Sequence, residues 1–519
     1  EMCIRDSDEG LYDHDVDFRD IMSDLVKKRK KLQPVRLEFL GKPDDSIAAL
    51  IAKTLKVRDS FIFWQTAPLT MDFLSSVERK LEKNSELFFA PLTPQKSPSI
   101  DTKRPMIEQI KQHDIMLNYP YENINQFIRL LEEAAENPDV VSIKITLYRV
   151  ARDSKIISAL TRAAENGKDV LALVELRARF DEENNIGWSK CLEDAGVTVI
   201  YGLDELKVHS KLLLITLRDG NDVSYITQVG TGNYNERTSK LYTDLTLMTA
   251  DRDFGSDASV VFNALAVGNT VESTNKLLVA PKGLKSRIVE LIDNEITYKD
   301  KGYIGIKMNS LTDKDIIEKL AEASRAGVKI ELVVRGICCL IAGVEGDTEN
   351  IRVISIVGRF LEHSRIYIFG TGDRRRVYIS SADFMTRNTE RRVEVAAPLL
   401  DKSIADRAVE IFETMLRDNV KAREQDSDGN YYHVQPKEGE PRLNSQIYFY
   451  EQAYKAAEQA QHEEEEREQN LRERKAPKAE ELAQAAAALG APYTVPTAPN
   501  GYSQSAKPIH QVKIRRIRK

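Results

Sequence analysis

The 519-residue sequence predicts an α/β protein with two similar domains in tandem, and three observations support this prediction. A pattern of helix, strand, helix and strand occurs twice between about residues 120 and 395. In each copy the second helix is followed by a glycine, Gly167 or Gly327, as expected just past a helix C-terminus. The strands are aliphatic runs joined by helices, which is typical of mixed, largely parallel sheets with helices on both faces.

The first copy reads NINQFIRLLEEAAENP, VVSIKITLYR, KIISALTRAAENG and DVLALVELRAR, and the second SRIVELIDNEI, GYIGIKMNSL, DIIEKLAEASRAG and VKIELVVRG. We therefore expect α/β domains at 96–277 and 278–455. Residues 1–95 mix short helices and strands and predict a small α+β unit, of which 1–13 are expected to be an artefact or disordered. The charged, Ala- and Pro-rich tail at 456–519 is expected to be helical and then disordered.

Composition excludes several classes of protein. The net charge of −6 on a chain of this length argues against a general nucleic-acid binder. The four cysteines show no metal-ligand spacing, which fits a reduced compartment. No apolar run approaches the ~20 residues of a membrane span. We expect a cytoplasmic protein, and peripheral membrane association stays open.

Two of the seven histidines occur in matching contexts, KVHSKLLLI with His209 and LEHSRIYIF with His363. A single strand over 205–215 would place His209 and Lys211 on the same face. A lone histidine beside a strand is usually structural. Its duplication at equivalent places in a repeat favours a functional pair.

Arginines end several predicted strands, where ligands of parallel α/β sheets bind. Their planar forks suit phosphate oxygens, although each could instead pair with a nearby carboxylate such as Glu175 or Asp181. The glycine-rich turn GTGNYN at 230–235 could add backbone N–H groups for an anion. The arginines concerned are Arg149, Arg177, Arg179 and Arg335.

A histidine among cationic side chains, without a serine or cysteine nucleophile, suggests covalent catalysis at an imidazole nitrogen. The neutral ring would attack phosphorus while fixed positive charges stabilise the transition state. A second histidine could exchange a proton or hold the transferred group. On this interpretation His209 and Lys211 both contact one phosphate.

Together with these histidine motifs, ITLYRVARDSKIISAL, VELRARFDEENNI, GTGNYNERTSKLYTD and TERRVEVAAP resemble the class 1 polyphosphate kinases over about residues 14–455. The resemblance implies phospholipase D-like catalytic domains and reversible transfer of the terminal phosphate of ATP to inorganic polyphosphate, with ADP as product, through a phosphohistidine and with Mg²⁺. It implies His209 as the nucleophile, with His363 and Lys211 also catalytic. Tyr242, Arg335 and His363 would contact ATP.

The resemblance also implies a set of phosphate contacts. Arg149 and Arg179 would lie beside the Mg²⁺–phosphate cluster without being direct ligands, because arginine has no lone pair to offer a cation. The whole expected set is Arg149, Arg179, Lys211, Asn233, Arg365 and Arg392.

The sequence departs from the family at its N-terminus, where the helical domain and part of the head domain are missing. The resemblance implies that residues 1–95 are the C-terminal part of a head domain, and the shortening weakens the expectation of a family-like homo-oligomer, which stays open. Asn118 and Tyr119 replace the paired histidines usual before PYE. Two other functions stay open. One is a phospholipase D-like phosphodiesterase, although Thr216 and Gly370 stand in that class's aspartate positions. The other is a non-catalytic polyphosphate-binding remnant.

Overall fold

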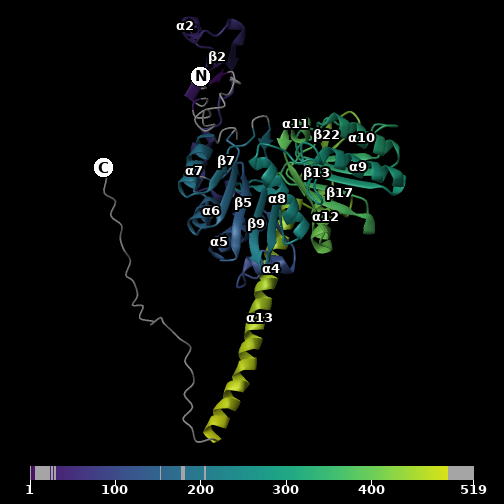
Figure 1. Ribbon diagram of the computed structural model, residues 1–519. Helices are drawn as coiled ribbons and strands as arrows, with labels where there is room; N and C mark the ends of the chain where they lie inside the picture. Colours follow the sequence, from purple (N-terminus) through teal and green to yellow (C-terminus); the bar gives the residue numbers. More distant parts are fainter. Residues whose placement is uncertain are drawn as a thin grey trace. The chain divides into compact units, whose positions relative to one another are not determined.

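The computed structural model shows a small N-terminal segment, two larger α/β domains and a long C-terminal helix (Figure 1). The residues that it describes are 2–5, 24, 27–28, 31–151, 153–176, 182–203 and 206–488. None of the helices within these ranges combines the length and the apolar character needed to cross a bilayer.

The N-terminal segment is a small α+β unit, as predicted. Strand β2 pairs antiparallel with β1 and parallel with β3, and Leu37, Ala52 and Val57 form its small core. Residues 2–5 thus form a strand, while 6–13 lie outside the described residues. Its elements are β1 (Met2–Arg5), β2 (Pro34–Leu40), α2 (Asp45–Leu55), β3 (Ile62–Gln65) and α3 (Leu74–Leu81).

The first α/β domain is built on a sheet in the order β11-β10-β9-β5-β6-β7, with β4 paired to β11. Gly167 follows helix α6 with a φ of +79°, the left-handed conformation predicted from its position. The elements are α4 (Met106–Gln112), β4 (Ile115–Tyr119), α5 (Asn125–Glu136), β5 (Val140–Leu147), α6 (Lys155–Glu165), β6 (Asp169–Val174), α7 (Glu182–Asp194), β7 (Thr198–Ile200), β8 (Lys207–Val208), β9 (Leu212–Asp219), β10 (Asp222–Gly230), β11 (Tyr242–Thr249) and α8 (Arg252–Ala266).

The second α/β domain repeats this plan in a sheet ordered β12-β20-β18-β17-β13-β14-β15-β21-β22. Gly327 follows α10 with a φ of +95°, again as predicted. The elements are β12 (Leu278–Val279), α9 (Leu284–Tyr298), β13 (Tyr303–Met308), α10 (Lys314–Arg325), β14 (Lys329–Val334), β15 (Ile351–Ile356), β16 (Leu361–Glu362), β17 (Arg365–Phe369), β18 (Arg376–Ser380), α11 (Thr386–Glu390), β19 (Arg392–Val393), β20 (Val395–Pro398), α12 (Lys402–Leu416), β21 (Ala422–Gln425) and β22 (Tyr431–His433).

The tandem α/β prediction is confirmed, but the expectation of largely parallel sheets is wrong. Among the described residues, the parallel strand pairs inside each domain are those of β5-β6-β7, joined by α6 and α7, and of β13-β14-β15, where α10 joins the first two strands. Strands β9 and β10 pair antiparallel, as do β17 and β18, because short turns connect them. A turn of that length cannot make the crossover that parallel strands need.

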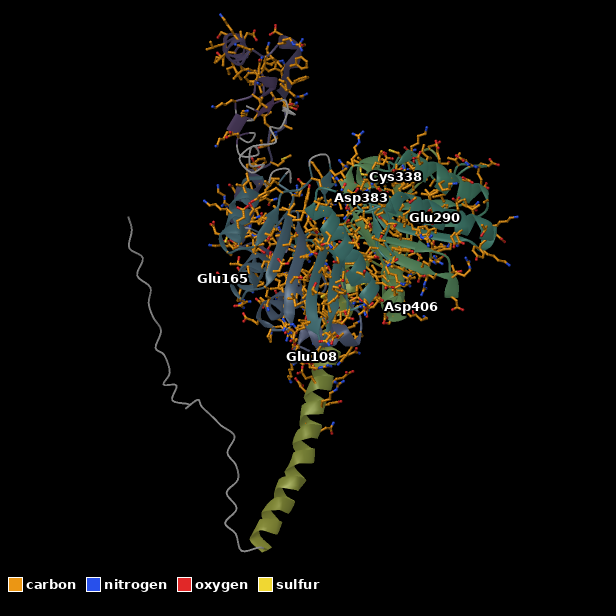
Figure 2. The ribbon with its side chains drawn as sticks, in the orientation of Figure 1. Glu108, Glu165, Glu290, Cys338, Asp383 and Asp406 are labelled. Atoms are coloured by element: carbon orange, nitrogen blue, oxygen red, sulfur yellow. The ribbon has the colours of Figure 1, made fainter. Side chains whose placement is uncertain are left out.

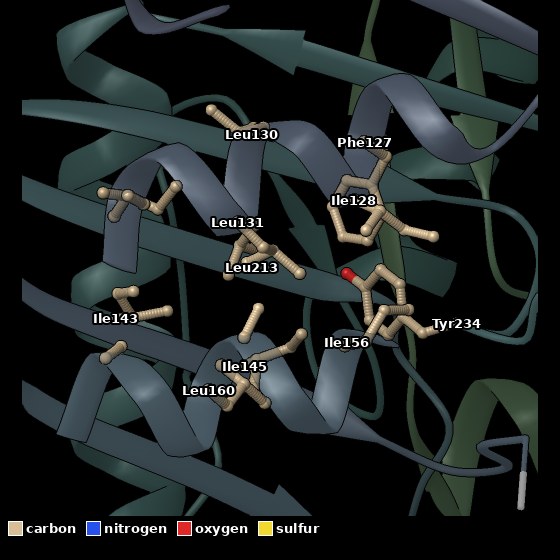
Figure 3. Close-up of a cluster of buried hydrophobic side chains, with 14 of the residues drawn as sticks. Phe127, Ile128, Leu130, Leu131, Ile143, Ile145, Ile156, Leu160, Leu213 and Tyr234 are labelled. Atoms are coloured by element: carbon tan, nitrogen blue, oxygen red, sulfur yellow. The ribbon is translucent and has the colours of Figure 1, made fainter. Parts of the chain in front are cut away.

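Both sheets are covered by helices. The outer face of the first sheet packs on α5 and α6, where Phe127, Leu131 and Leu160 contact Ile143 and Ile145 of β5 (Figure 3). The outer face of the second packs on α9 and α10. The inner faces share one apolar cluster with α8 and α12, so the two domains have a common core.

The C-terminal helix α13 (Ser445–Ala488) begins inside the second domain. The carboxylate of Asp418 accepts hydrogen bonds from Ser445 N at 2.8 Å and Ser445 Oγ at 2.7 Å. Gln446 Nε2 donates to Glu362 Oε1 at 2.6 Å, directly beside His363. The helix runs to Ala488, and residues 489–519 lie outside the described residues.

Candidate active site

Two very short parallel ladders connect the domains and position both histidines. Strand β8 of the first domain pairs with β19 of the second, in the register Lys207 to Arg392 and Val208 to Val393. Strand β16 of the second domain pairs with β11 of the first, in the register Leu361 to Tyr242 and Glu362 to Thr243. The residues that follow each ladder are therefore His209 beside Glu394, and His363 beside Asp244.

The predicted continuous strand over 205–215 is interrupted at the histidine. Strand β8 ends at Val208 and β9 starts at Leu212. The backbone N–H groups of His209 and Ser210 both donate to Val393 O, each at 2.9 Å, which breaks the regular ladder. His209 and Lys211 therefore lie in the gap between two strands.

Each histidine is held by a carboxylate from the other domain. His209 Nδ1 lies 2.9 and 3.0 Å from the carboxylate oxygens of Glu394. His363 Nδ1 lies 2.9 and 3.0 Å from those of Asp244. A carboxylate acceptor holds the proton on Nδ1, which leaves the Nε2 lone pair of His209 for chemistry, whereas Nε2 of His363 lies 3.4 Å from Arg365 Nη1. No described residue hydrogen-bonds Nε2 of His209.

Hydroxyl groups orient both carboxylates in the same way. Thr231 Oγ1 donates to Asp244 at 2.6 Å, and Ser381 Oγ donates to Glu394 at 2.5 Å. A Cβ on Gly232 would lie 2.0 Å from Asp244 Oδ2, so only glycine fits there. The N–H groups of Gly230 and Thr231 bond backbone carbonyls. The glycine turn therefore makes room for Asp244. Its two N–H groups at Gly230 and Thr231 are already bonded, so they do not cradle the anion that the sequence led us to expect.

The part of the site around His209 is its first half, and the part around His363 is its second half. Lys211 lies in the first half and is 1% exposed. Its ammonium group donates to the carbonyl of His209 and lies 5.4 Å from the Tyr148 ring centroid. The rings of Tyr148 and His209 form a T-shaped pair with 4.9 Å between their centroids. Burial lowers the pKa of Lys211 to about 7. A phosphate group entering here would favour the charged ammonium.

The histidines themselves are neutral in this environment. Burial, followed by the charges of Lys211 and Arg392, holds the pKa of His209 well below its usual value. Burial also lowers the pKa of His363, against the opposing effect of Asp244. Burial raises the pKa of Glu394 to about 7. An unprotonated imidazole is what a nucleophilic histidine requires.

The other predicted residues fall into two groups. In the first, Arg392 Nη1 lies 3.8 Å from Glu394 Oε1, and Arg149 lies beside Tyr148 with 5.5 Å from Cζ to the ring centroid. Asn233 Oδ1 is buried and receives no hydrogen bond from a described residue. Arg177 and Arg179 lie outside the described residues.

The second group surrounds His363. Tyr242 lies over it, with 5.4 Å between ring centroids. Arg335 donates to Asn309 Oδ1 at 3.1 and 2.9 Å and to Glu362 O at 2.9 Å, which fixes its guanidinium.

Arg365 completes this group. It forms a two-point ion pair with Asp383 at 3.2 and 3.0 Å, and it donates to Thr231 O of the first domain at 3.1 Å. Arg365, which was expected to contact phosphate, is thus already paired with a carboxylate.

Sequence reasoning missed Asp244, Glu394, Asp383 and Tyr148. The signal for the first two lies in the repeat, because LYTDLTL and RRVEVAA both place a carboxylate just before an aliphatic run. Either carboxylate alone looks like an ordinary surface residue. Asn118 and Tyr119, which replace the family's paired histidines, lie on β4, where Tyr119 pairs with Asp244.

The described residues do not fit a magnesium ion held by the protein. They contain no group of three or more His, Cys, Asp or Glu side chains that could hold a metal. The acidic side chains of the site already bond neighbours: Asp244 to His363, Asp383 to Arg365, Glu394 to His209 and Glu362 to Lys307 at 3.2 Å. Mg²⁺ often binds mainly through substrate phosphates and water. We therefore treat it as part of the substrate complex.

Comparisons with known proteins agree with this architecture. A family model described as polyphosphate kinase C-terminal domain 1 matches residues 105–271, and one described as C-terminal domain 2 matches residues 277–446. A polyphosphate kinase of Bacillus anthracis is 45% identical over 450 residues, covering 85% of this chain and 64% of the relative. One of Staphylococcus epidermidis is 45% identical over 442 residues, covering 84% and 60%.

A solved structure gives the same result. The crystal structure of polyphosphate kinase from Porphyromonas gingivalis matches with a TM-score of 0.74 and 35% sequence identity, covering 82% of this chain and 65% of that one. The chain thus spans less than two thirds of the length of these relatives.

Proposed function

The chain belongs to the polyphosphate kinase family, with two phospholipase D-like domains in tandem, and from this premise we propose that it transfers the terminal phosphate of ATP reversibly to inorganic polyphosphate. The transfer proceeds through a phosphohistidine at His209. ATP or ADP and polyphosphate are the substrates, with Mg²⁺ carried on their phosphates. The proposed location is the cytoplasm.

One observation carries the proposal. His209 Nδ1 is engaged by the buried carboxylate of Glu394 at 2.9 Å, while burial and neighbouring cations keep its ring neutral. Its Nε2 therefore holds a free lone pair in a cationic space bounded by Lys211 and Arg392. This combination suits attack on a phosphorus atom that already carries negative charge.

The reaction takes two steps. In the first, Nε2 of His209 bonds to the γ-phosphorus, the bond to the bridging oxygen breaks, and ADP leaves with that oxygen. The phosphorylated ring gains positive charge, which Glu394 stabilises through Nδ1–H. In the second, a terminal oxygen of polyphosphate attacks the phosphorus and the N–P bond breaks. The polymer is then one phosphate longer and the ring is neutral again.

The remaining site residues have supporting roles in this scheme. Lys211 and Arg392 stabilise the transferring group in the first half, and Asn233 and Arg149 contact its oxygens. Arg179, which lies outside the described residues, remains a predicted contact. In the second half His363, Tyr242 and Arg335 hold the nucleotide, and Arg365, whose charge is balanced by Asp383, is not assigned a phosphate.

The test is covalent labelling. The chain is incubated with γ-32P-ATP and Mg²⁺, and base-stable, acid-labile protein label is measured. We expect label in the natural sequence, none in His209→Ala, and unchanged label in His433→Ala, which alters an exposed histidine of β22. Label that survives in His209→Ala would refute the assignment.

Because the chain is shorter than its relatives, the same experiment is repeated with 32P-polyphosphate as donor, which needs no adenine site. Label from polyphosphate alone would place the defect in nucleotide binding. Cleavage of a model phosphodiester with no histidine label would favour the phospholipase D-like alternative. Polymer binding with no label from either donor would favour the non-catalytic one.

A further inference from the structure

The two halves of the site correspond residue by residue. After β10 the chain runs Thr231-Gly232-Asn233, and after β18 it runs Ser381-Ala382-Asp383. Thr231 N donates to Leu245 O at 2.9 Å, and Ser381 N donates to Val395 O at 3.0 Å. The two hydroxyls bond the two histidine-holding carboxylates as described above. Position 233 in the first half is therefore equivalent to position 383 in the second.

This equivalence exposes a difference in charge. In the second half Asp383, labelled in Figure 2, forms the two-point ion pair with Arg365, which neutralises that cation. In the first half the equivalent cation is Lys211 and the equivalent side chain is the neutral amide of Asn233. No described carboxylate forms an ion pair with Lys211.

The surroundings of the two positions agree with this difference. Asp383 is 7% exposed, and its Oδ1 also accepts Asn309 N at 2.7 Å, so its acceptor positions are occupied. Asn233 Oδ1 is buried without a hydrogen-bond donor among the described residues. The neutral amide at position 233 forms no ion pair with Lys211, whereas Asp383 balances the charge of Arg365.

We infer that the carboxylate of Asp383 occupies, in the second half, the place that the transferred phosphoryl group occupies in the first half. The difference between Asn233 and Asp383 thereby confines phosphorylation to His209. The inference rests on the proposed function. Charge is its physical basis. Arg365 and Asp383 together present no net attraction to an anion, and the carboxylate repels a phosphoryl group, whereas Lys211 keeps its full attraction when protonated.

The test exchanges the two residue pairs. Arg365→Lys/Asp383→Asn gives the second half the residues of the first, and Lys211→Arg/Asn233→Asp does the reverse. The donor is 32P-polyphosphate, because it carries no adenine to favour one half. In each transfer Nε2 bonds to the terminal phosphorus and the shortened polymer leaves with the bridging oxygen. Labelled peptides that contain His209 or His363 are separated and counted.

In the natural sequence we expect label on the His209 peptide alone. Arg365→Lys/Asp383→Asn should raise label on the His363 peptide at least about tenfold, and Lys211→Arg/Asn233→Asp should lower label on the His209 peptide at least about tenfold. Label that stays on His209, unchanged, in both folded variants would overturn the inference.

Controls separate the possible failures. Thermal unfolding establishes that each variant is folded, and if the first does not fold, the second decides the question. A natural sequence that takes no label from ATP or polyphosphate would overturn the proposed function, and this inference with it. Label on both histidines of the natural sequence would overturn the inference alone.

Discussion

Replacing Glu394 by glutamine keeps the size of the side chain and removes its charge beside His209. Glu394 Oε2 accepts from Ser381 Oγ at 2.5 Å, and Ser381 Oγ itself accepts from Val395 N at 3.1 Å. The carboxylate is the nearest acceptor for the serine proton, and the other acceptor, Val395 O, lies at 3.4 Å. In Glu394→Gln the carbonyl oxygen would take that proton, and the NH₂ group would turn toward Nδ1 of His209.

This orientation determines the size of the effect. An NH₂ group donates to Nδ1, so the ring proton moves to Nε2 and blocks the nucleophile. Loss of a hydrogen bond to a charged group alone would cost about 1.5–3 kcal/mol, roughly 10–150-fold in rate. A wrong tautomer costs more, about 10⁴-fold in the Ser-His-Asp triad. We expect Glu394→Gln to lose about 10³–10⁴-fold.

The assay is single-turnover formation of 32P-protein from γ-32P-ATP, followed by rapid quench. Asp244→Asn is the matched control, because it makes the same change beside His363, which does not carry the phosphoryl group in the proposed mechanism. We expect it to cost less. A folded Glu394→Gln variant that is labelled within about threefold of the natural rate would refute the tautomer argument.

Three further predictions follow from the site. Charged Lys211 is lost as pH rises above its pKa of about 7, and ionised Glu394 is lost as pH falls below its pKa of about 7, so kcat/KM should be bell-shaped near neutrality. Lys211→Arg should move the alkaline limb upward, and a profile without limbs would contradict this. Gly232→Ala should lower the free energy of unfolding in urea by about 1–3 kcal/mol and slow labelling, because its Cβ would clash with Asp244. The control Gly187→Ala, whose Cβ would meet open space, should do neither. Equal effects of the two changes would argue against the close contact with Asp244. Arg335→Ala should raise KM for ATP and leave labelling from polyphosphate intact, and an unchanged KM would remove it from the nucleotide site.

The sequence predicted the tandem domains and the two histidines because both repeat along the chain. It could not predict the partners of those histidines. Asp244 lies 35 residues from His209 in its own domain but contacts His363, and Glu394 contacts His209 across the same boundary. A sequence pattern within one copy of the repeat cannot reveal a contact with a residue of the other copy.

The register of the repeat shows a similar limit. Both copies contain an Ile-Lys pair in their first strand, which suggests that Lys144 and Lys307 correspond. The strand pairing instead makes Thr146 the equivalent of Lys307. Thr146 Oγ1 donates to Ser210 O at 2.8 Å, as Lys307 Nζ donates to Ser364 O at 3.0 Å. The pairing of the strands reveals this shift of two residues. The sequence does not, because either alignment of the two copies fits an aliphatic strand equally well.

The exchange of carboxylates between the domains has a consequence for divided forms of the protein. A chain cut between 271 and 277, where the two matched domains adjoin, would yield two pieces that each contain one histidine and the carboxylate needed by the other. Neither piece would hold an oriented imidazole. Their association would restore both histidines at once, so reconstituted activity from separate pieces would report directly on the docking of the two domains.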